Sequence, residues 1–127
     1  MTNKLLKELM NLPLTDFGNA LRLQAIFGKR WVYLPRFKSW MYRDLHSWKG
    51  KRTLDAIYAA SRAFHELVQE IYCLPVPQEE RERDRLERII DWLLRSEGTS
   101  RVRHAVYMYR DMQLAEAAVR EDVLRNN

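Results

Sequence analysis

The sequence contains little of what disulfide-rich, membrane and all-β proteins depend on. Its single cysteine, Cys73, excludes an internal disulfide and any multi-cysteine metal site. Four glycines and four prolines in 127 residues are few for all-β architectures, which use these residues in frequent turns. No stretch approaches the roughly 20 apolar residues of a membrane helix, and residues 1–10 lack the apolar run of a signal peptide. We therefore expect a cytoplasmic protein without a membrane partner, and we expect Cys73 to be a small buried side chain.

The residue patterns of common catalytic and cofactor sites are missing as well. The sequence has no Gly-rich phosphate loop, no nucleotide fingerprint and no Asp-x-Asp pair for a two-metal polymerase site. The segment His65-Glu66-Leu67-Val68-Gln69 comes close to the zinc motif H-E-x-x-H, but glutamine stands in place of the second histidine. The carboxylates of residues 79–84 alternate with arginines, which is typical of a solvated helix face. We predict that the chain is not itself an enzyme and holds no metal or cofactor.

What is present is typical of one folded domain. Hydrophobic residues make up 46% of the 127 residues and charged residues 31%. We interpret residues 1–127 as a single domain with three parts. These are N-terminal helices over residues 1–28, a basic aromatic β-hairpin over 29–52, and a helical bundle over 53–127.

Two short helices are predicted in the first part. Apolar residues at helical spacing predict one helix over residues 3–11, which Pro13 ends. Thr15 can cap the second helix, and Gly28 is suited to end it. The buried stripe of this second helix is predicted from its apolar residues, which include Phe17 and Leu21.

The middle of the chain changes to strand-forming residues. Residues 31–34 and 40–42 are aromatic and β-branched and predict two short strands joined by a turn, with a third strand as a further candidate around Trp48. From Thr53 the helical period returns, and residues 114–124 either continue the preceding helix or fold back. The predicted fold is mainly α, a bundle of about five helices with a small β-hairpin inserted between the second and third.

Positive charge is concentrated in the hairpin segment. Residues 27–52 carry eight basic residues against one acidic residue, a net charge of +7, whereas the whole chain carries +5. A local basic cluster attracts polyanions, and single-stranded nucleic-acid sites combine cations for the backbone with aromatic faces for the bases. The candidate nucleic-acid-binding residues are Lys29, Arg30, Arg36, Phe37, Lys38, Arg43, Lys49, Lys51 and Arg52.

A second interpretation of the same segment remains open. The aromatic side chains can anchor the hairpin on the helices while the cations only keep the surface hydrated. Because successive residues of a strand face opposite sides, both interpretations can hold, with Trp31 and Tyr33 on one face. Phe37 lies in the predicted turn and is the aromatic residue that packing explains least.

A family resemblance rests on one run of residues and on the spacing of tryptophans. The run Leu14-Thr15-Asp16-Phe17-Gly18-Asn19-Ala20-Leu21-Arg22 resembles the T-D-x-G-N-A-x-R opening of a helical domain in phage and plasmid primase–helicases of the poxvirus type. Tyr33-Leu34-Pro35, Trp40 and Trp48 are similar to the aromatic stretch that follows in that family, and the resemblance covers roughly residues 12 to 110. The chain departs from the family at Asp44-Leu45-His46-Ser47, where an Asp-Gly turn is usual, and no helicase motor lies within the 127 residues.

The resemblance implies a role beside a primase and a superfamily-three helicase. The chain would be a non-catalytic DNA-replication module, in the cytoplasm of a bacterial host if phage or plasmid encoded. It would bind DNA, single-stranded in preference to duplex, or dock to the helicase or primase. The alternative is a protein-interaction or inhibitor module that acts on a replication protein without touching DNA. The family pattern also implies that Trp40 and Trp48 are largely buried.

Overall fold

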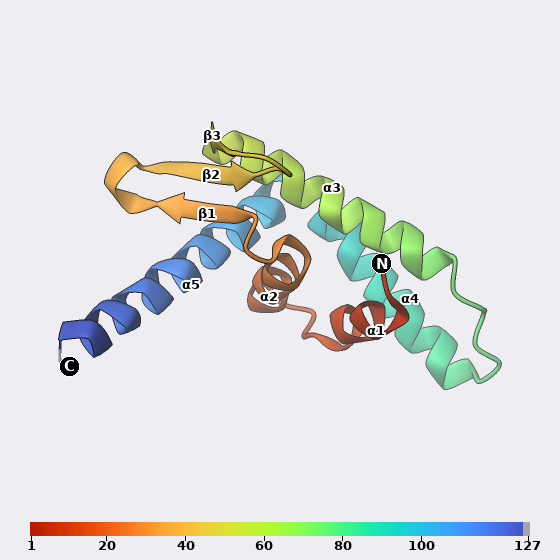
Figure 1. Cartoon of the computed structure of the whole chain (residues 1–127). Helices are drawn as coiled ribbons and strands as arrows, with labels where there is room; N and C mark the ends of the chain where they lie inside the picture. Colours follow the sequence, from red (N-terminus) through yellow and green to blue (C-terminus); the bar gives the residue numbers. More distant parts are fainter. Residues whose placement is uncertain (126–127) are drawn as a thin grey trace.

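The chain folds into five helices with a small sheet inserted between the second and third (Figure 1). The computed structural model describes the backbone of residues 1–125 and the side chains of 1–98 and 100–120. This architecture confirms the predicted mainly α fold, and the sheet has a third strand in addition to the hairpin. The elements in chain order are α1 (Asn3–Asn11), α2 (Asp16–Phe27), β1 (Trp31–Leu34), the short 3-10 helix η1 (Pro35–Phe37), β2 (Ser39–Arg43), β3 (Trp48–Lys51), α3 (Thr53–Tyr72), α4 (Glu80–Ser96) and α5 (Thr99–Arg125).

Local capping sets the limits of the first two helices. The Thr15 hydroxyl accepts a hydrogen bond from the Gly18 N–H at 2.9 Å and so caps α2, as the sequence predicts. At the other end Gly28 has a φ of 58°, in the left-handed region that favours glycine, and its N–H donates to the Gln24 carbonyl. The chain can therefore turn sharply out of α2 and enter β1.

The three strands form an antiparallel sheet in the order β1-β2-β3. Trp31 pairs with Tyr42 and Tyr33 pairs with Trp40, so these four aromatic side chains share one face of the sheet. That face packs on the helices, and Trp40 is only 1% exposed. A three-stranded sheet of this size requires such packing for its stability.

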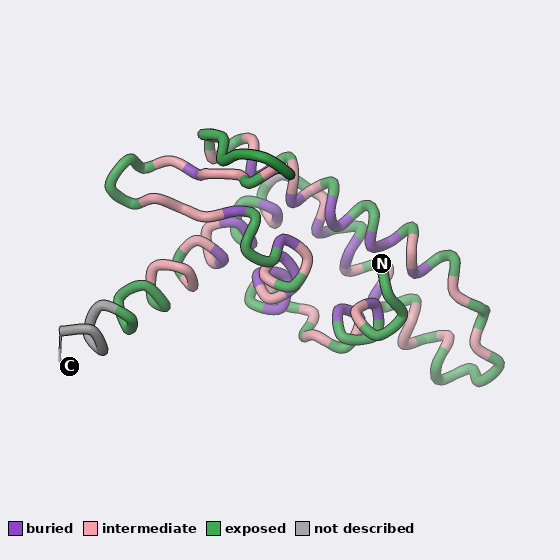
Figure 2. Tube along the Cα trace, viewed as in Figure 1, coloured by how far each residue is buried: buried purple, intermediate pink, exposed green. Residues whose placement is uncertain are grey.

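The long helix α5 contributes to the core with its first half and projects from it with its second half. Val102, Ala105, Val106 and Tyr109 are buried, whereas residues 115–120 are all exposed (Figure 2). Residues 114–124 thus continue the preceding helix and do not fold back. The tip of the hairpin extends in the same direction as the end of α5 (Figure 1). No helix in the described part of the chain is long and apolar enough to span a bilayer.

Two predictions of burial in the helical part of the chain are wrong. Phe17 is exposed, because the inward side of α2 is formed by Asn19, Ala20, Arg22 and Leu23. Cys73 is also exposed, because α3 ends at Tyr72 and the chain leaves the helix bundle there.

Candidate nucleic-acid interface

The register of the sheet divides its side chains between a packed face and a free face. Opposite residues in an antiparallel pair point to the same side. The pairs Val32–Met41, Leu34–Ser39, Met41–Gly50 and Arg43–Trp48 therefore lie on the face opposite the packed one. The second half of α5 runs along one side of this face, where Val32, Arg43 and Trp48 line a groove with it. The Arg30 carbonyl accepts a hydrogen bond from the Arg43 N–H at 2.9 Å. Arg30 is therefore opposite Arg43 in the ladder and lies on the same side of the sheet. We call this side the outward face; it consists of Arg30, Val32, Leu34, Ser39, Met41, Arg43, Trp48 and Gly50.

Most aromatic residues of the basic segment belong to the opposite, packed face. The Trp40 ring stacks on Tyr109 of α5 with centroids 5.9 Å apart and lies edge-on to Trp31 at 6.2 Å. Tyr33 contacts Trp40 at 5.3 Å, and Tyr42 contacts Trp31 at 5.0 Å. Contacts of this kind stabilise an aromatic core beyond the area they bury. For these four residues the packing interpretation is therefore correct.

Helix α5 fixes the free edge of β1. The Gln113 side chain accepts a hydrogen bond from the Tyr33 N–H at 2.9 Å and donates one to the Trp31 carbonyl at 2.8 Å. The Tyr109 hydroxyl also reaches the Trp31 carbonyl, at 3.4 Å, and burial raises the pKa of this phenol. These contacts hold the sheet at a fixed orientation on the bundle.

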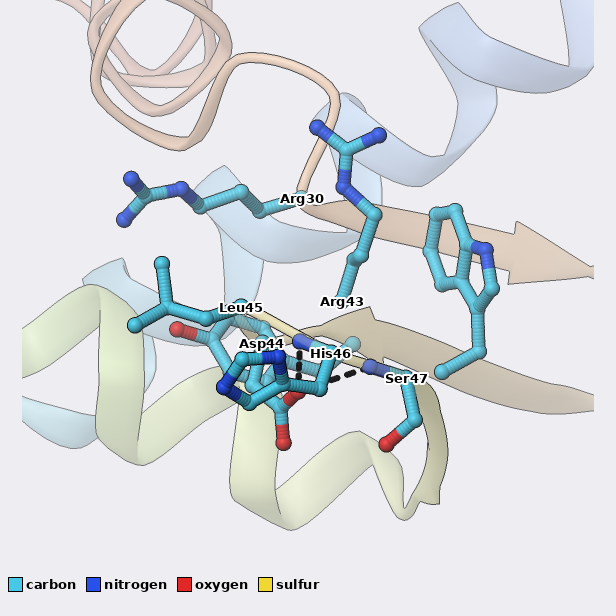
Figure 3. Close-up of a pocket in the computed structure, with 8 residues that line it drawn as sticks. Arg30, Arg43, Asp44, Leu45, His46 and Ser47 are labelled. Atoms are coloured by element: carbon cyan, nitrogen blue, oxygen red, sulfur yellow. Dashed lines mark hydrogen bonds between the residues drawn. The ribbon is translucent and has the colours of Figure 1, made fainter.

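Two arginines and a tryptophan gather at the end of the sheet where β2 turns into β3. They line a hollow of about 460 Å³ together with residues 44–47 of the turn (Figure 3). The Arg43 guanidinium lies 5.8 Å from the centroid of the Trp48 ring, and the guanidinium groups of Arg30 and Arg43 point in different directions. Trp48 is 46% exposed, so its predicted burial is wrong. The physical reason is the register: Trp48 is paired with Arg43 and shares the outward face with it.

An ionised aspartate fixes the turn below this hollow. Asp44 Oδ1 accepts hydrogen bonds from the backbone N–H groups of His46 at 2.8 Å and Ser47 at 2.9 Å. Lys49 Nζ lies 3.0 Å from the other carboxylate oxygen. The backbone donor of His46 and the ammonium group of Lys49 lower the pKa of Asp44 to about 2. Asp44 therefore forms this turn with its own side chain, which accepts from the backbone two and three residues further on.

A second basic group lies at the opposite end of the sheet, at the tip of the hairpin. Phe37 is 69% exposed there, as the sequence predicts, and Lys38 adopts a left-handed φ of 49°. Lys38, Lys51 and Arg52 line a further hollow of about 460 Å³. Arg52 is partly neutralised by Asp55, whose carboxylate oxygen lies 3.5 Å from its Nε.

The nine candidate residues are therefore not one patch. Arg30 and Arg43 lie at the turn end, and five lie at the tip end, namely Arg36, Phe37, Lys38, Lys51 and Arg52. Lys49 is paired with Asp44, and Lys29 lines the groove between β1 and α5 beside Glu116. The sequence analysis did not identify Trp48 as an exposed aromatic residue. Its pairing with Arg43 would have indicated that it is exposed, but this pairing is known only from the register of β2 and β3.

The near-zinc motif on α3 is part of a surface hydrogen-bond chain. His65 Nδ1 lies 3.2 Å from the carboxylate of Glu97, which follows α4 as its C-cap, and His65 Nε2 lies 3.3 Å from Gln69 Nε2. All three side chains belong to the exterior of the α3–α4 pair. Among the described residues, no group of three His, Cys, Asp or Glu side chains is arranged to hold a metal ion.

The most specific motif of the sequence lies at the α1–α2 junction, away from the sheet's outward face. Arg22 is 0% exposed, and its guanidinium donates to the carbonyls of Leu9 at 3.0 Å, Leu12 at 2.7 Å and Pro13 at 2.8 Å. These are carbonyls at and just beyond the end of α1, which have no partner within that helix. Burial lowers the pKa of Arg22 to about 10, so the side chain stays protonated at neutral pH.

The neighbouring motif residues complete this buried junction. Asn19 Oδ1 accepts from Arg22 at 3.1 Å and from the Trp92 indole at 3.0 Å, and Asn19 Nδ2 donates to Ser96 at 2.9 Å. Gly18 is required because a Cβ there would overlap the Pro13 carbonyl. Residues 15–22 thus join α1, α2 and α4, and their contacts have a structural role that requires no ligand.

Comparisons with protein-family models, curated proteins and solved structures find no match to this chain.

Proposed function

We propose that the chain is a non-catalytic DNA-replication module that binds single-stranded DNA along the outward face of its sheet. The observation that carries this proposal is the free face itself. Its turn end presents Arg30, Arg43 and the exposed Trp48, and the hairpin tip next to its other end presents Arg36, the exposed Phe37 and Lys38. Lys51 pairs with Trp40 and lies on the opposite side of the sheet. Proteins that bind single strands combine a basic path for phosphates with aromatic rings on which bases stack.

The geometry favours a single strand over a duplex. Bases must be unstacked from a partner strand before they can lie on an exposed ring. The two basic ends are separated by the length of β2, five residues or about 15 Å at roughly 3.3 Å per residue. Between them Gly50 leaves open space on the outward face, since nothing lies within 4 Å of the Cβ position there. A flexible strand can follow this face and contact both ends.

The assignment to replication comes from the resemblance of residues 14–22 and of the aromatic spacing to the domain of primase–helicases. That resemblance implies a superfamily-three helicase or a primase as protein partner. The α1–α2 junction gives a physical reason for the residue types of the motif in this fold, because Thr15, Asn19 and Arg22 each make a hydrogen bond there and Gly18 leaves room for the Pro13 carbonyl.

One observation favours the protein-interaction or inhibitor alternative. The centre of the outward face is aliphatic, with half-buried Val32, Leu34 and Met41 between the two basic ends. Aliphatic side chains contribute little to base stacking but much to a protein interface. A docking surface for a helicase would use this centre, and DNA binding would use the ends.

Binding of a fluorescent oligo(dT) at several salt concentrations tests the proposal. Contact with about four phosphates predicts a log–log slope near −3, because single strands release roughly 0.7 counterions per phosphate. Replacing Arg36 and Lys38 together should flatten the slope by about one unit or more, because both exposed side chains lie at the tip. The absence of binding of both oligo(dT) and duplex DNA at about 50 mM salt would overturn the DNA function and leave the docking alternative.

Aromatic substitutions separate stacking from charge. Phe37→Ala and Trp48→Ala should each weaken binding by roughly 1–3 kcal/mol without changing the slope, since stacking releases no counterions. Trp40→Ala is the matched control among the tryptophans. Because Trp40 is buried, its loss should destabilise the fold by roughly 3–5 kcal/mol. A Trp48→Ala variant that binds oligo(dT) as well as the wild type would remove Trp48 from the site.

A further inference from the structure

A second hollow lies at the same end of the sheet as the turn-end hollow. It has a volume of about 280 Å³ and lies between the sheet, α2 and α3. Arg30 and Tyr42 line both hollows, so the two are neighbours on either side of these residues. Past Arg30 the turn end of the sheet therefore adjoins the surface of α3.

The sequence of α3 creates this space. Ala59 and Ala63, four residues apart on one side of the helix, face the hollow where larger side chains would fill it. The remaining apolar wall comes from the sheet and α2, and it includes the rings of Phe27, Trp31 and Tyr42. Because Phe27 and Trp31 are buried, the half-buried Tyr42 and the small Ala59 provide most of the accessible apolar surface, on which a planar ring can lie.

Charged groups stand around this apolar space. Arg62 of α3 and Arg30 line the hollow together with one carboxylate, Glu66. Arg62 lies outside the basic segment 27–52, and its side chain is exposed. Within the part of the chain that the structure describes, none of the ion pairs at 4.0 Å or less involves Arg30, Arg43 or Arg62. Lys49 and Arg52, by contrast, are held by Asp44 and Asp55.

We propose that this hollow is a second nucleotide subsite, in which a base of single-stranded DNA enters the space beside Ala59 and its phosphate contacts Arg62. The proposal rests on the proposed DNA function and extends it from the sheet to α3. A strand that lies on Trp48 and Arg43 would pass Arg30 and end at Arg62. Arg30, which lines both hollows, would contact the phosphate between the two subsites.

The charge of Arg62 is tested by Arg62→Ala, with oligo(dT) of increasing length as the probe. One lost phosphate contact should flatten the salt slope by about 0.7 and weaken binding roughly eightfold at 50 mM salt. Arg88→Ala is the matched control, because Arg88 is an exposed helical arginine of α4 that lines neither hollow. The loss should appear only with oligonucleotides long enough to reach past Trp48, and the shortest ones that bind should not distinguish Arg62→Ala from wild type.

The space itself is tested by Ala59→Leu, which fills the hollow without changing charge. It should weaken binding of the longer oligonucleotides severalfold and leave the slope unchanged, whereas Ala115→Leu on the exposed part of α5 should do neither. Both variants place a good helix former in a helix, so the fold should persist, as thermal unfolding would verify. If wild type binds and Trp48→Ala weakens binding, but Arg62→Ala and Ala59→Leu bind as wild type, the second subsite is refuted and the proposed function stands. If wild type binds no DNA, both are refuted.

Discussion

Arg22 and Arg43 show how differently the same side chain is used in two regions of this molecule. Arg22, at the α1–α2 junction, is fully buried and donates to three backbone carbonyls and to Asn19. Arg43, on the outward face, is exposed and lies over the ring of Trp48. The donors of Arg22 are used by the chain itself, whereas the guanidinium of Arg43 faces a hollow. An arginine in the sequence therefore indicates a binding surface only where the fold leaves the N–H donors of its guanidinium group free.

The comparison also separates two kinds of sequence motif. The run of residues 14–22 is the most specific motif in the chain, and its polar members form a buried junction between α1, α2 and α4. The basic aromatic segment is compositional and less specific, yet its cations reach the surface. In this chain the motif of residues 14–22 has a structural role, and the basic aromatic segment of residues 27–52 contains most of the candidate site.

The largest expected effect comes from breaking the junction at Gly18. Gly18→Ala should destabilise the protein by about 4 kcal/mol or more, because the added Cβ overlaps the Pro13 carbonyl. Gly50→Ala is the matched control on the sheet, where the Cβ position is open, and it should change stability by less than about 1 kcal/mol. Urea unfolding measures both. Equal effects at the two glycines would contradict the description of a close-packed junction and an open sheet face.

A smaller loss of stability is expected when the buried charge is removed. Arg22→Met should cost about 3 kcal/mol, because the buried carbonyls of Leu9 and Leu12 lose their donor. The Arg22→Met variant, at a temperature at which it is still folded, should bind oligo(dT) as tightly as the wild type does. Arg43→Met should show the reverse pattern, with a change in stability near zero and a salt slope flatter by about 0.7. An Arg22→Met variant that is fully stable but binds DNA less well would invert the assignment of the two arginines.

The smallest effect concerns pH and the turn below Trp48. The pKa of Asp44 is lowered to about 2 in the folded chain, so the ionised carboxylate stabilises the fold. This contribution is complete above the ordinary aspartate pKa of about 3.9 and is lost as the pH falls through about 2. Asp44→Ala should therefore lower the melting temperature at pH 7, and the difference from wild type should vanish near pH 2.

An NMR titration of the Asp44 carboxyl gives the same information directly. A midpoint near 4 would show that the hydrogen bonds from His46 and Ser47 do not hold the turn in solution. Asp44→Asn, followed by thermal unfolding, separates the two contributions to stability, because the amide oxygen still accepts from the backbone while the attraction to Lys49 is lost.

The elements of the fold were predictable because local chemistry determines them. Pro13, Thr15 and Gly28 act through their own backbone or the next turn, and the alternation of Trp31 and Tyr33 sets the packed face of β1. The burial of Arg22 was not predictable from periodicity, which treats arginine as polar. Its backbone acceptors are carbonyls at and just beyond the end of another helix, 9 to 13 residues earlier in the chain.

The candidate site was predictable in its composition and not in its arrangement. The nine residues follow from the charge of segment 27–52, but their division between the two ends of the sheet depends on the strand register. The burial of Trp48 was predicted from the family pattern alone, and the register that contradicts it could not be derived across the four-residue turn from Asp44 to Ser47. Arg62 was outside the charged segment and becomes part of the site only because α3 packs beside the sheet.

The Gln113 side chain has a consequence for self-association. A strand at the edge of a sheet presents unpaired N–H and C=O groups that can template the addition of another chain. On β1 the amide of Gln113 occupies the Tyr33 N–H and the Trp31 carbonyl, as a neighbouring strand would. Lysines and β-bulges on the edge strands of other proteins prevent pairing with another chain, and on β1 the side chain of Gln113 has this effect. The same contact that orients the sheet therefore leaves the Tyr33 N–H and the Trp31 carbonyl unavailable to a strand added at this edge.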